Sequence, residues 1–74
     1  MAKLAEYKFT NESEFDGAKE RLYKEMYGDY NTSNKIEFYG FSGGEGYVRI
    51  YDECSDPALV GKICRTFGGV PYNY

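Results

Sequence analysis

The stretch FYGFSGGEGYVRIY, residues 38–51, decides the fold of this chain. Apolar and polar or aromatic side chains alternate on both sides of a glycine-rich segment, which is typical of two antiparallel strands joined by a tight turn. We therefore predict strands over residues 35–41 and 47–53, with the segment SGGEG between them as the turn. Since neighbouring strand residues point to opposite faces, the most apolar side chains of this hairpin share the face that the core covers. These are Ile36, Phe38, Val48 and Ile50.

A strand and a helix are predicted before the hairpin. Residues 3–10 alternate between apolar and polar side chains, as a half-buried strand does. Residues 11–28 follow with apolar side chains at helical spacing. Asn11 and Glu14 have the spacing of a capping box, and Gly28 suits the left-handed position that ends a helix.

A second helix is predicted after the hairpin, over residues 55–69. Asp56 as the cap and Pro57 at the first helical position are strong start signals, and two glycines end the helix. The segment VPYNY, residues 70–74, either forms a short last strand or trails from the domain. As a strand it belongs at a sheet edge, because Pro71 cannot donate a backbone hydrogen bond.

The order strand, helix, strand, strand, helix, short strand predicts an α+β fold of the ferredoxin-like βαββαβ type. Residues 1–74 are expected to form a single domain, since so short a chain has no room for two cores. Both helices would pack on one face of an antiparallel sheet and leave the other face open.

The open face is the candidate contact site. If the most apolar side chains of the hairpin lie under the helices, five others must lie on the open side, together with Glu6, Lys8 and Thr10 of the first strand. The five candidate partner-binding residues are Tyr39, Phe41, Tyr47, Arg49 and Tyr51. Two interpretations stay open. Aromatic cross-strand pairs stabilise sheets, and tyrosine together with arginine is also typical of protein contact sites.

A second candidate surface is an acidic stripe on the first helix, where Glu12, Asp16 and Glu20 recur every four residues. Such a stripe is either a solvated helix face, balanced by the neighbouring lysines and arginine, or a docking surface for a basic partner.

The composition limits the classes of function. The net charge of −3 argues against non-specific binding to phosphates, which needs a clustered basic surface. The absence of histidine removes the usual general base and the commonest zinc ligand. We therefore expect no enzyme activity, no cofactor and no metal site.

The two cysteines and the first residues indicate a reducing compartment. The segment MAKLAEYKFT lacks the long apolar run of a signal peptide, and no segment approaches the length of a membrane span, so we expect a cytoplasmic protein. Thiols stay reduced there, so we expect Cys64 to be an inert side chain on the buried helix face and Cys54 to be a partly exposed thiol.

The segment GEGYVRIY resembles the third-strand motif of the RNA-recognition fold, which has the same order of strands and helices. Gly46, Tyr47 and Val48 match its glycine–aromatic–valine core, and the resemblance implies that Tyr47 stacks on a base. Glu45 and Ile50 depart from that motif, which has aromatic residues at both positions. Binding of single-stranded nucleic acid is therefore kept as the alternative function.

The first hypothesis is a non-catalytic protein-binding or inhibitory module that acts through the aromatic open face. Its partner is either another protein or a second copy in a dimer. A small, acidic, tyrosine-rich chain is also similar in composition to phage-encoded inhibitors of host defence complexes, such as anti-CRISPR proteins. That likeness implies a viral protein that inhibits a host nucleoprotein complex by occluding a basic nucleic-acid channel.

Overall fold

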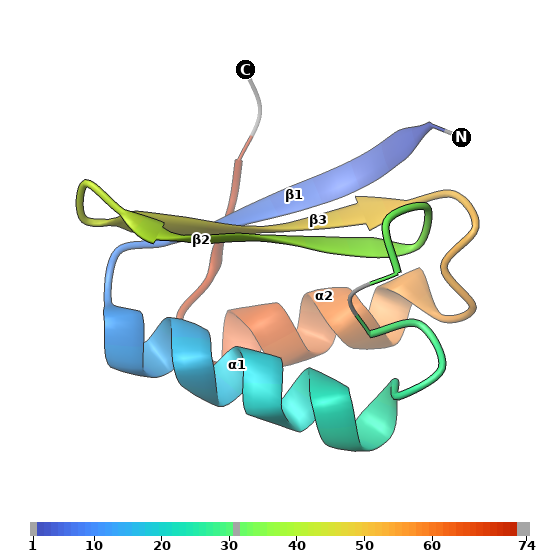
Figure 1. The fold of residues 1–74 in the computed structure, drawn as a ribbon, viewed down its shortest axis with the longest axis horizontal. Coiled ribbons are helices and arrows are strands. Elements are labelled where there is room, and N and C mark those ends of the chain that lie inside the picture. The colour runs from blue at the N-terminus through green and yellow to red at the C-terminus, as the bar shows by residue number, and fades with distance from the viewer. Residues whose placement is uncertain (1, 31, 73–74) are drawn as a thin grey trace.

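The computed structural model describes residues 2–30 and 32–72 and consists of two layers (Figure 1). A four-stranded sheet forms one layer, with strand order β2-β3-β1-β4 and antiparallel neighbours. Both helices cover the same face of that sheet. The predicted α+β class, with an antiparallel sheet and two helices, is confirmed. In chain order the elements are β1 (Lys3–Phe9), α1 (Glu12–Glu25), β2 (Ile36–Ser42), β3 (Glu45–Tyr51), α2 (Pro57–Thr66) and β4 (Val70–Pro71).

The hairpin of β2 and β3 has the register that the alternation predicts near its centre. Ile36, Val48 and Ile50 are at most 1% exposed and lie under the helices. The turn between the strands consists of Gly43 and Gly44, with φ angles of 63° and 83°. Two successive left-handed residues make the tight turn whose twist matches that of the flanking strands, which is why glycine stands at both positions.

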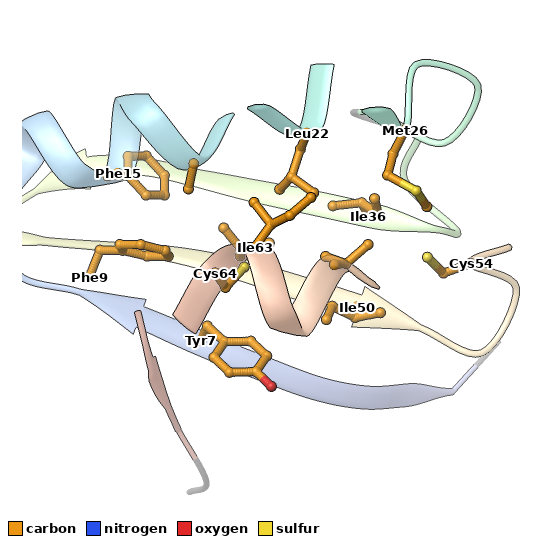
Figure 2. Packing of buried hydrophobic residues seen from close by; sticks show 13 residues of the cluster. Tyr7, Phe9, Phe15, Leu22, Met26, Ile36, Ile50, Cys54, Ile63 and Cys64 are labelled. Atoms are coloured by element: carbon orange, nitrogen blue, oxygen red, sulfur yellow. The ribbon is translucent and has the colours of Figure 1, made fainter. Parts of the chain in front are cut away.

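The core lies between the sheet and the two helices (Figure 2). From the sheet come the hairpin side chains together with Phe9 and Tyr7 of β1, and the ring of Phe9 meets that of Phe15 at a centroid distance of 5.5 Å. The helices contribute the apolar stripes that their periodicity predicts, which are Phe15, Ala18 and Leu22 from α1 and Val60, Ile63 and Cys64 from α2.

Both helix starts are confirmed. The Asn11 side chain accepts a hydrogen bond of 3.0 Å from the Glu14 N–H, and the Asp56 carboxylate accepts one of 3.2 Å from the Leu59 N–H, directly before Pro57. These bonds satisfy backbone donors that a helix start otherwise leaves without a partner.

The predicted end of the first helix is wrong. It ends at Glu25 with Met26 as its cap, and not at Gly28. The Met26 side chain is buried in the core, and the Asp29 carboxylate that follows is buried against Ser55. Since the Asp29 carboxylate is bonded to Ser55, the chain leaves the helix before the glycine. Tertiary contacts therefore set this boundary.

The last strand lies at a sheet edge, as Pro71 requires. Pro71 is paired with Tyr7, and Val70 is paired with Lys8. For the segment 70–74, a short strand and a trailing end were both open alternatives. Val70 and Pro71 form a strand, and residues 73–74 lie outside the described residues. The short β4 nevertheless fixes where the next residue, Tyr72, stands relative to the open face of the sheet.

Candidate functional site

A row of charged side chains crosses the open face of the sheet. The register places Glu37 of β2 beside Arg49 of β3, and Arg49 beside Glu6 of β1. Glu6 is only 4% exposed, and its carboxylate lies 3.0 Å from the Lys3 ammonium and 3.4 Å from the Arg49 guanidinium. A buried carboxylate is tolerated when cations compensate it, and here two cations do so.

Arg49 is held in place from both sides. Its guanidinium lies 4.7 Å from the centre of the Tyr39 ring and donates a hydrogen bond of 3.1 Å to the Tyr39 hydroxyl. On its other side it contacts the Glu6 carboxylate. Cation–π stacking and the ion pair therefore fix a planar donor group in the middle of the face.

Glu37 joins two tyrosines of the same face. Its carboxylate accepts hydrogen bonds from the hydroxyls of Tyr51 and Tyr39, the latter at 2.8 Å. These two bonds hold the pKa of Glu37 below its ordinary value. The bond to Glu37, together with burial, raises the pKa of Tyr39 to about 12. All three side chains are thereby held in place by hydrogen bonds.

A second row follows the first. The register places Tyr47 between Tyr39 and Lys8. The Tyr47 hydroxyl donates a hydrogen bond of 2.8 Å to Glu45, whose carboxylate also lies 2.9 Å from the Lys8 ammonium. The bond to Glu45 is the main cause that raises the pKa of Tyr47 to about 12. The Tyr47 ring packs against the ring of Tyr72, at a centroid distance of 5.3 Å.

These side chains enclose an open hollow of about 380 Å³, which we call the tyrosine hollow. Its floor and rim combine three aromatic rings with one buried acid and one guanidinium. It is lined by Glu6, Tyr39, Tyr47, Arg49 and Tyr72. An apolar wall with a few fixed polar groups is what a binding site for a protruding side chain requires.

Three of the five candidate residues predicted from the sequence meet in the tyrosine hollow. Tyr39, Tyr47 and Arg49 line it, and Tyr39 is 40% exposed. Tyr51 contacts the same network but is only 8% exposed, with its hydroxyl directed at Glu37. Its ring therefore offers little area to a partner and instead helps to fix the other side chains.

The predicted orientation of Phe41 is wrong. Its ring packs against Phe15 of α1 at a centroid distance of 5.9 Å, which places it on the helix side of the sheet. The cause is a register shift between Tyr39 and Ser42, where β2 has one more residue than β3. An irregularity of this kind reverses the direction of the side chains beyond it.

Tyr72 and the buried state of Glu6 were not predicted from the sequence. Tyr72 reaches the hollow because its N–H donates a hydrogen bond of 2.8 Å to the Glu6 carbonyl, which continues the pairing of β4 with β1. The alternation of residues 3–10 places Glu6 on the open face but does not reveal that the neighbouring strands supply the side chains that cover it.

The acidic stripe does not take part in this site. Glu12, Asp16 and Glu20 are all exposed on α1, which covers the opposite face of the sheet. Thr10 follows the end of β1 and is exposed. The stripe and the tyrosine hollow are thus two separate surfaces.

A third feature is a cluster of aromatic rings beside β2, which the sequence analysis missed. The rings of Tyr23 and Tyr27 meet at 5.2 Å, those of Tyr23 and Tyr30 at 5.3 Å, and those of Tyr30 and Phe38 at 4.9 Å. Tyr23 is 49% exposed and Tyr27 is 70% exposed. We call these four residues the edge cluster, because Phe38 belongs to the outermost strand of the sheet.

Both cysteines are buried free thiols. This confirms the prediction for Cys64, whose thiol pKa is raised to about 12 by burial. The predicted partial exposure of Cys54 is wrong, since it is 7% exposed. Cys54 belongs to the core cluster, and next to it Asp29 accepts hydrogen bonds of 2.7 Å from both the N–H and the hydroxyl of Ser55.

No group of three or more acidic or cysteine side chains with metal-binding geometry occurs among residues 2–30 and 32–72. Within the same residues, neither helix has the length and apolar character to cross a bilayer. Comparison with protein-family models, curated proteins and solved structures finds no match to this chain.

Proposed function

We propose that this chain is a non-catalytic protein-binding module that contacts its partner through the open face of the sheet. The observation that carries the proposal is the tyrosine hollow, in which three rings and a fixed guanidinium surround an accessible volume of about 380 Å³. Tyrosine and arginine are the residues that most often dominate binding energy at protein interfaces.

The fixed geometry of the face supports this function. Tyr39 and Arg49 are each bound to neighbours within the sheet, and the Tyr47 hydroxyl is bound to Glu45. Side chains that are already ordered lose little rotamer entropy when a partner binds. If the rings served only to stabilise the sheet, no open hollow would be needed beside them.

The charge balance of the face indicates the chemistry of the partner. On the described part of this face, three basic side chains stand against three acidic ones, namely Lys3, Lys8 and Arg49 against Glu6, Glu37 and Glu45. Such a face attracts neither a polyanion nor a polycation strongly. We therefore propose that a neutral protruding segment, with an apolar side chain that enters the hollow, is the ligand.

We further propose the ferredoxin-like βαββαβ topology for this domain. The element order and the strand order β2-β3-β1-β4, with antiparallel neighbours throughout, support it. In this arrangement β3 and β1 are the central strands, and they carry the residues at the middle of the tyrosine hollow.

Binding of single-stranded nucleic acid is the second candidate. The paired rings of Tyr47 and Tyr72, with the Lys8 ammonium 5.5 Å from the centre of the Tyr72 ring, favour it, because bases stack on such rings. The ion pair of Lys8 with Glu45 weighs against it, since the carboxylate offsets the charge that a phosphate needs.

A photo-cross-linking experiment tests the proposed function. Benzoylphenylalanine placed at position 47 or 72 should cross-link to a protein other than this chain in lysate from the source cells, whereas the same group at position 27, on the other side of the molecule, should not. Tyr39→Ala should reduce that cross-linking by at least about tenfold, as loss of a binding hot spot does. Equal cross-linking from all three positions would refute the proposal, and salt-sensitive binding of oligonucleotides would favour the second candidate instead.

A further inference from the structure

The two edges of the sheet differ in how they are protected. The edge at β4 is a strand of two residues that contains Pro71. The edge at β2 is seven residues long and contains neither lysine nor proline. Its charged side chain, Glu37, is bonded to Tyr39 and Tyr51 on the open face of the same sheet, and its register shift lies beyond Tyr39, so the stretch from Ile36 to Tyr39 is regular. Natural proteins usually block exposed edges with short strands, proline or charged residues, because an unprotected edge pairs with other strands. The β2 edge is therefore the one that is open to another strand.

The register shows which backbone groups of β2 point outward. The Tyr51 N–H donates a hydrogen bond of 2.9 Å to the Lys35 carbonyl, so residues 35, 37 and 39 direct their backbone toward β3. Phe38 lies between them and directs both its N–H and its carbonyl to the outer edge. Within the described chain, β2 is the outermost strand on that side.

From these observations we infer that β2 pairs with β2 of a second copy of this chain, in an antiparallel dimer with a twofold axis beside Phe38. A closed twofold contact uses the same surface on both copies, and strand edges of one sequence satisfy that condition. The eight strands would then form one continuous sheet, with both helix layers on the same side.

The side chains favour this register over the one centred on Glu37. With Phe38 at the axis, Tyr39 of each copy lies opposite Glu37 of the other, so a phenol faces a carboxylate at two equivalent positions. Within one chain the Tyr39 hydroxyl donates to Glu37, so each carboxylate keeps its own phenol donor and no like charges face each other at these two positions. A shift that centres the axis on Glu37 would place two carboxylates opposite each other, and this is unfavourable.

The edge cluster adds apolar area to the same contact. Its rings extend from Phe38 through Tyr30 to Tyr23 and Tyr27, which are the most exposed aromatic side chains on this side of the molecule. The twofold axis beside Phe38 brings the two clusters toward each other. A large exposed aromatic patch next to an unprotected strand edge is typical of an interface.

The contact proposed for the open face shares Tyr39 with the dimer, since Tyr39 lines the hollow and also stands beside the dimer axis. That face lies on the opposite side of the sheet from the edge cluster, so the two hollows of a dimer would stay accessible. If the proposed function holds as well, a dimer would offer two equal sites and bind a repeated or dimeric partner more tightly than a single domain does.

Cysteine cross-linking tests the register directly. Residues 37 and 39 direct their backbone toward β3, so in the dimer Glu37 and the opposite Tyr39 would form a pair that exchanges no backbone hydrogen bonds. The Cα atoms of such a pair lie about 4.5 Å apart, within the range of a disulfide. A mixture of Glu37→Cys and Tyr39→Cys chains should therefore form a disulfide-linked heterodimer under mild oxidation, at a yield about tenfold above either variant alone. The parent chain is the control for Cys54 and Cys64, which are buried.

Backbone substitution tests the hydrogen bonds. Phe38→Pro removes the outward N–H, and Phe38→Val is the matched control because it loses the same ring but keeps that donor. The proline variant should dimerise about tenfold more weakly than the valine variant in sedimentation equilibrium, since two hydrogen bonds per dimer are lost. Circular dichroism shows whether each variant is folded, and the cysteine experiment applies even where the proline variant is not.

The inference is overturned if the chain stays monomeric up to about 1 mM, the weakest affinity that such a contact should have. It is also overturned if a dimer forms but Tyr47→Cys chains cross-link to each other while the mixture of edge variants does not. In either case the open face is left to be tested by its own cross-linking experiment, so failure of the dimer and failure of the proposed function are distinguishable.

Discussion

The two faces of the sheet are built from the same three long strands but have different chemistry. On the helix face, Ile36, Val48 and Ile50 are at most 1% exposed and make only apolar contacts. On the open face, tyrosines, charged side chains and a buried carboxylate hold one another by hydrogen bonds and ion pairs. Alternation along a strand thus separates stability on one side from recognition on the other.

The largest effect should come from the helix face. Leu22→Ala removes a fully buried side chain of α1 and should lower the free energy of unfolding by about 2–5 kcal/mol. A domain this small has little stability in reserve, so the variant should be largely unfolded. Urea denaturation followed by circular dichroism measures this loss. Tyr39→Ala, on the open face, is the comparison and should cost less than half as much.

The next effect concerns the buried Glu6 carboxylate of the open face. Glu6→Gln leaves Arg49 and Lys3 without the carboxylate they share, and should cost about 1–3 kcal/mol of unfolding free energy. A double-mutant cycle of Glu6→Gln with Arg49→Met should show a coupling above about 0.5 kcal/mol. Additive effects of the two substitutions would contradict the assigned ion pair.

Phe41 sharpens the comparison, because sequence alternation and structure assign it to opposite faces. If it packs on Phe15, Phe41→Ala should lower the free energy of unfolding by about 1–2 kcal/mol through the lost ring contact. It should leave partner cross-linking from position 47 unchanged. A variant that keeps its stability but loses cross-linking would place Phe41 on the open face after all.

An acid titration tests the contact between Asp29, in the loop after α1, and Ser55, in the loop after β3. Burial opposes ionisation of Asp29, but the bonds from Ser55 and the nearby Lys35 ammonium outweigh it and hold the pKa below its ordinary value. A lowered pKa in the folded state means that this stability is present above about pH 4 and is lost as the pH falls through the folded value. Asp29→Asn should therefore flatten the loss of stability between about pH 4 and pH 2, whereas Asp52→Asn, at an exposed position, should change it less.

The smallest effect concerns the phenols of the open face. Hydrogen bonds to Glu37 and Glu45 raise the pKa of Tyr39 and of Tyr47 to about 12. Because the folded values lie above the unfolded ones, these bonds stabilise the fold below about pH 10 and cease to do so as the pH rises through 12. Ultraviolet absorbance should show late titration of tyrosine, and Tyr39→Phe and Tyr47→Phe should each remove part of that late absorbance change.

Much of the fold could be predicted from the sequence because its signals are local. Asn11, Asp56 and Pro57 mark helix starts through bonds within one turn, and Gly43 with Gly44 marks a turn that needs left-handed residues. The hairpin register near its centre follows from side-chain alternation alone.

The rest depends on contacts between segments that are distant in the sequence. The end of α1 is set by Asp29 reaching Ser55, and the direction of Phe41 by a register shift that no residue pattern announces. Glu6 is buried only because β3 brings Arg49 beside it, and Tyr72 joins the hollow only because β4 pairs with β1. Alternation therefore identified the open face and three residues of the site, but not how that face closes around the hollow.

Hydroxyl-radical footprinting read by mass spectrometry tests the central claim most directly, since it reports the solvent exposure of each aromatic side chain in the intact chain. The structure predicts strong modification of Tyr27 and Tyr39 and protection of Tyr7, Tyr51 and Phe9. Protection of Tyr39 together with strong modification of Tyr51 would contradict the assignment of the two faces, and the tyrosine hollow would then not exist as described.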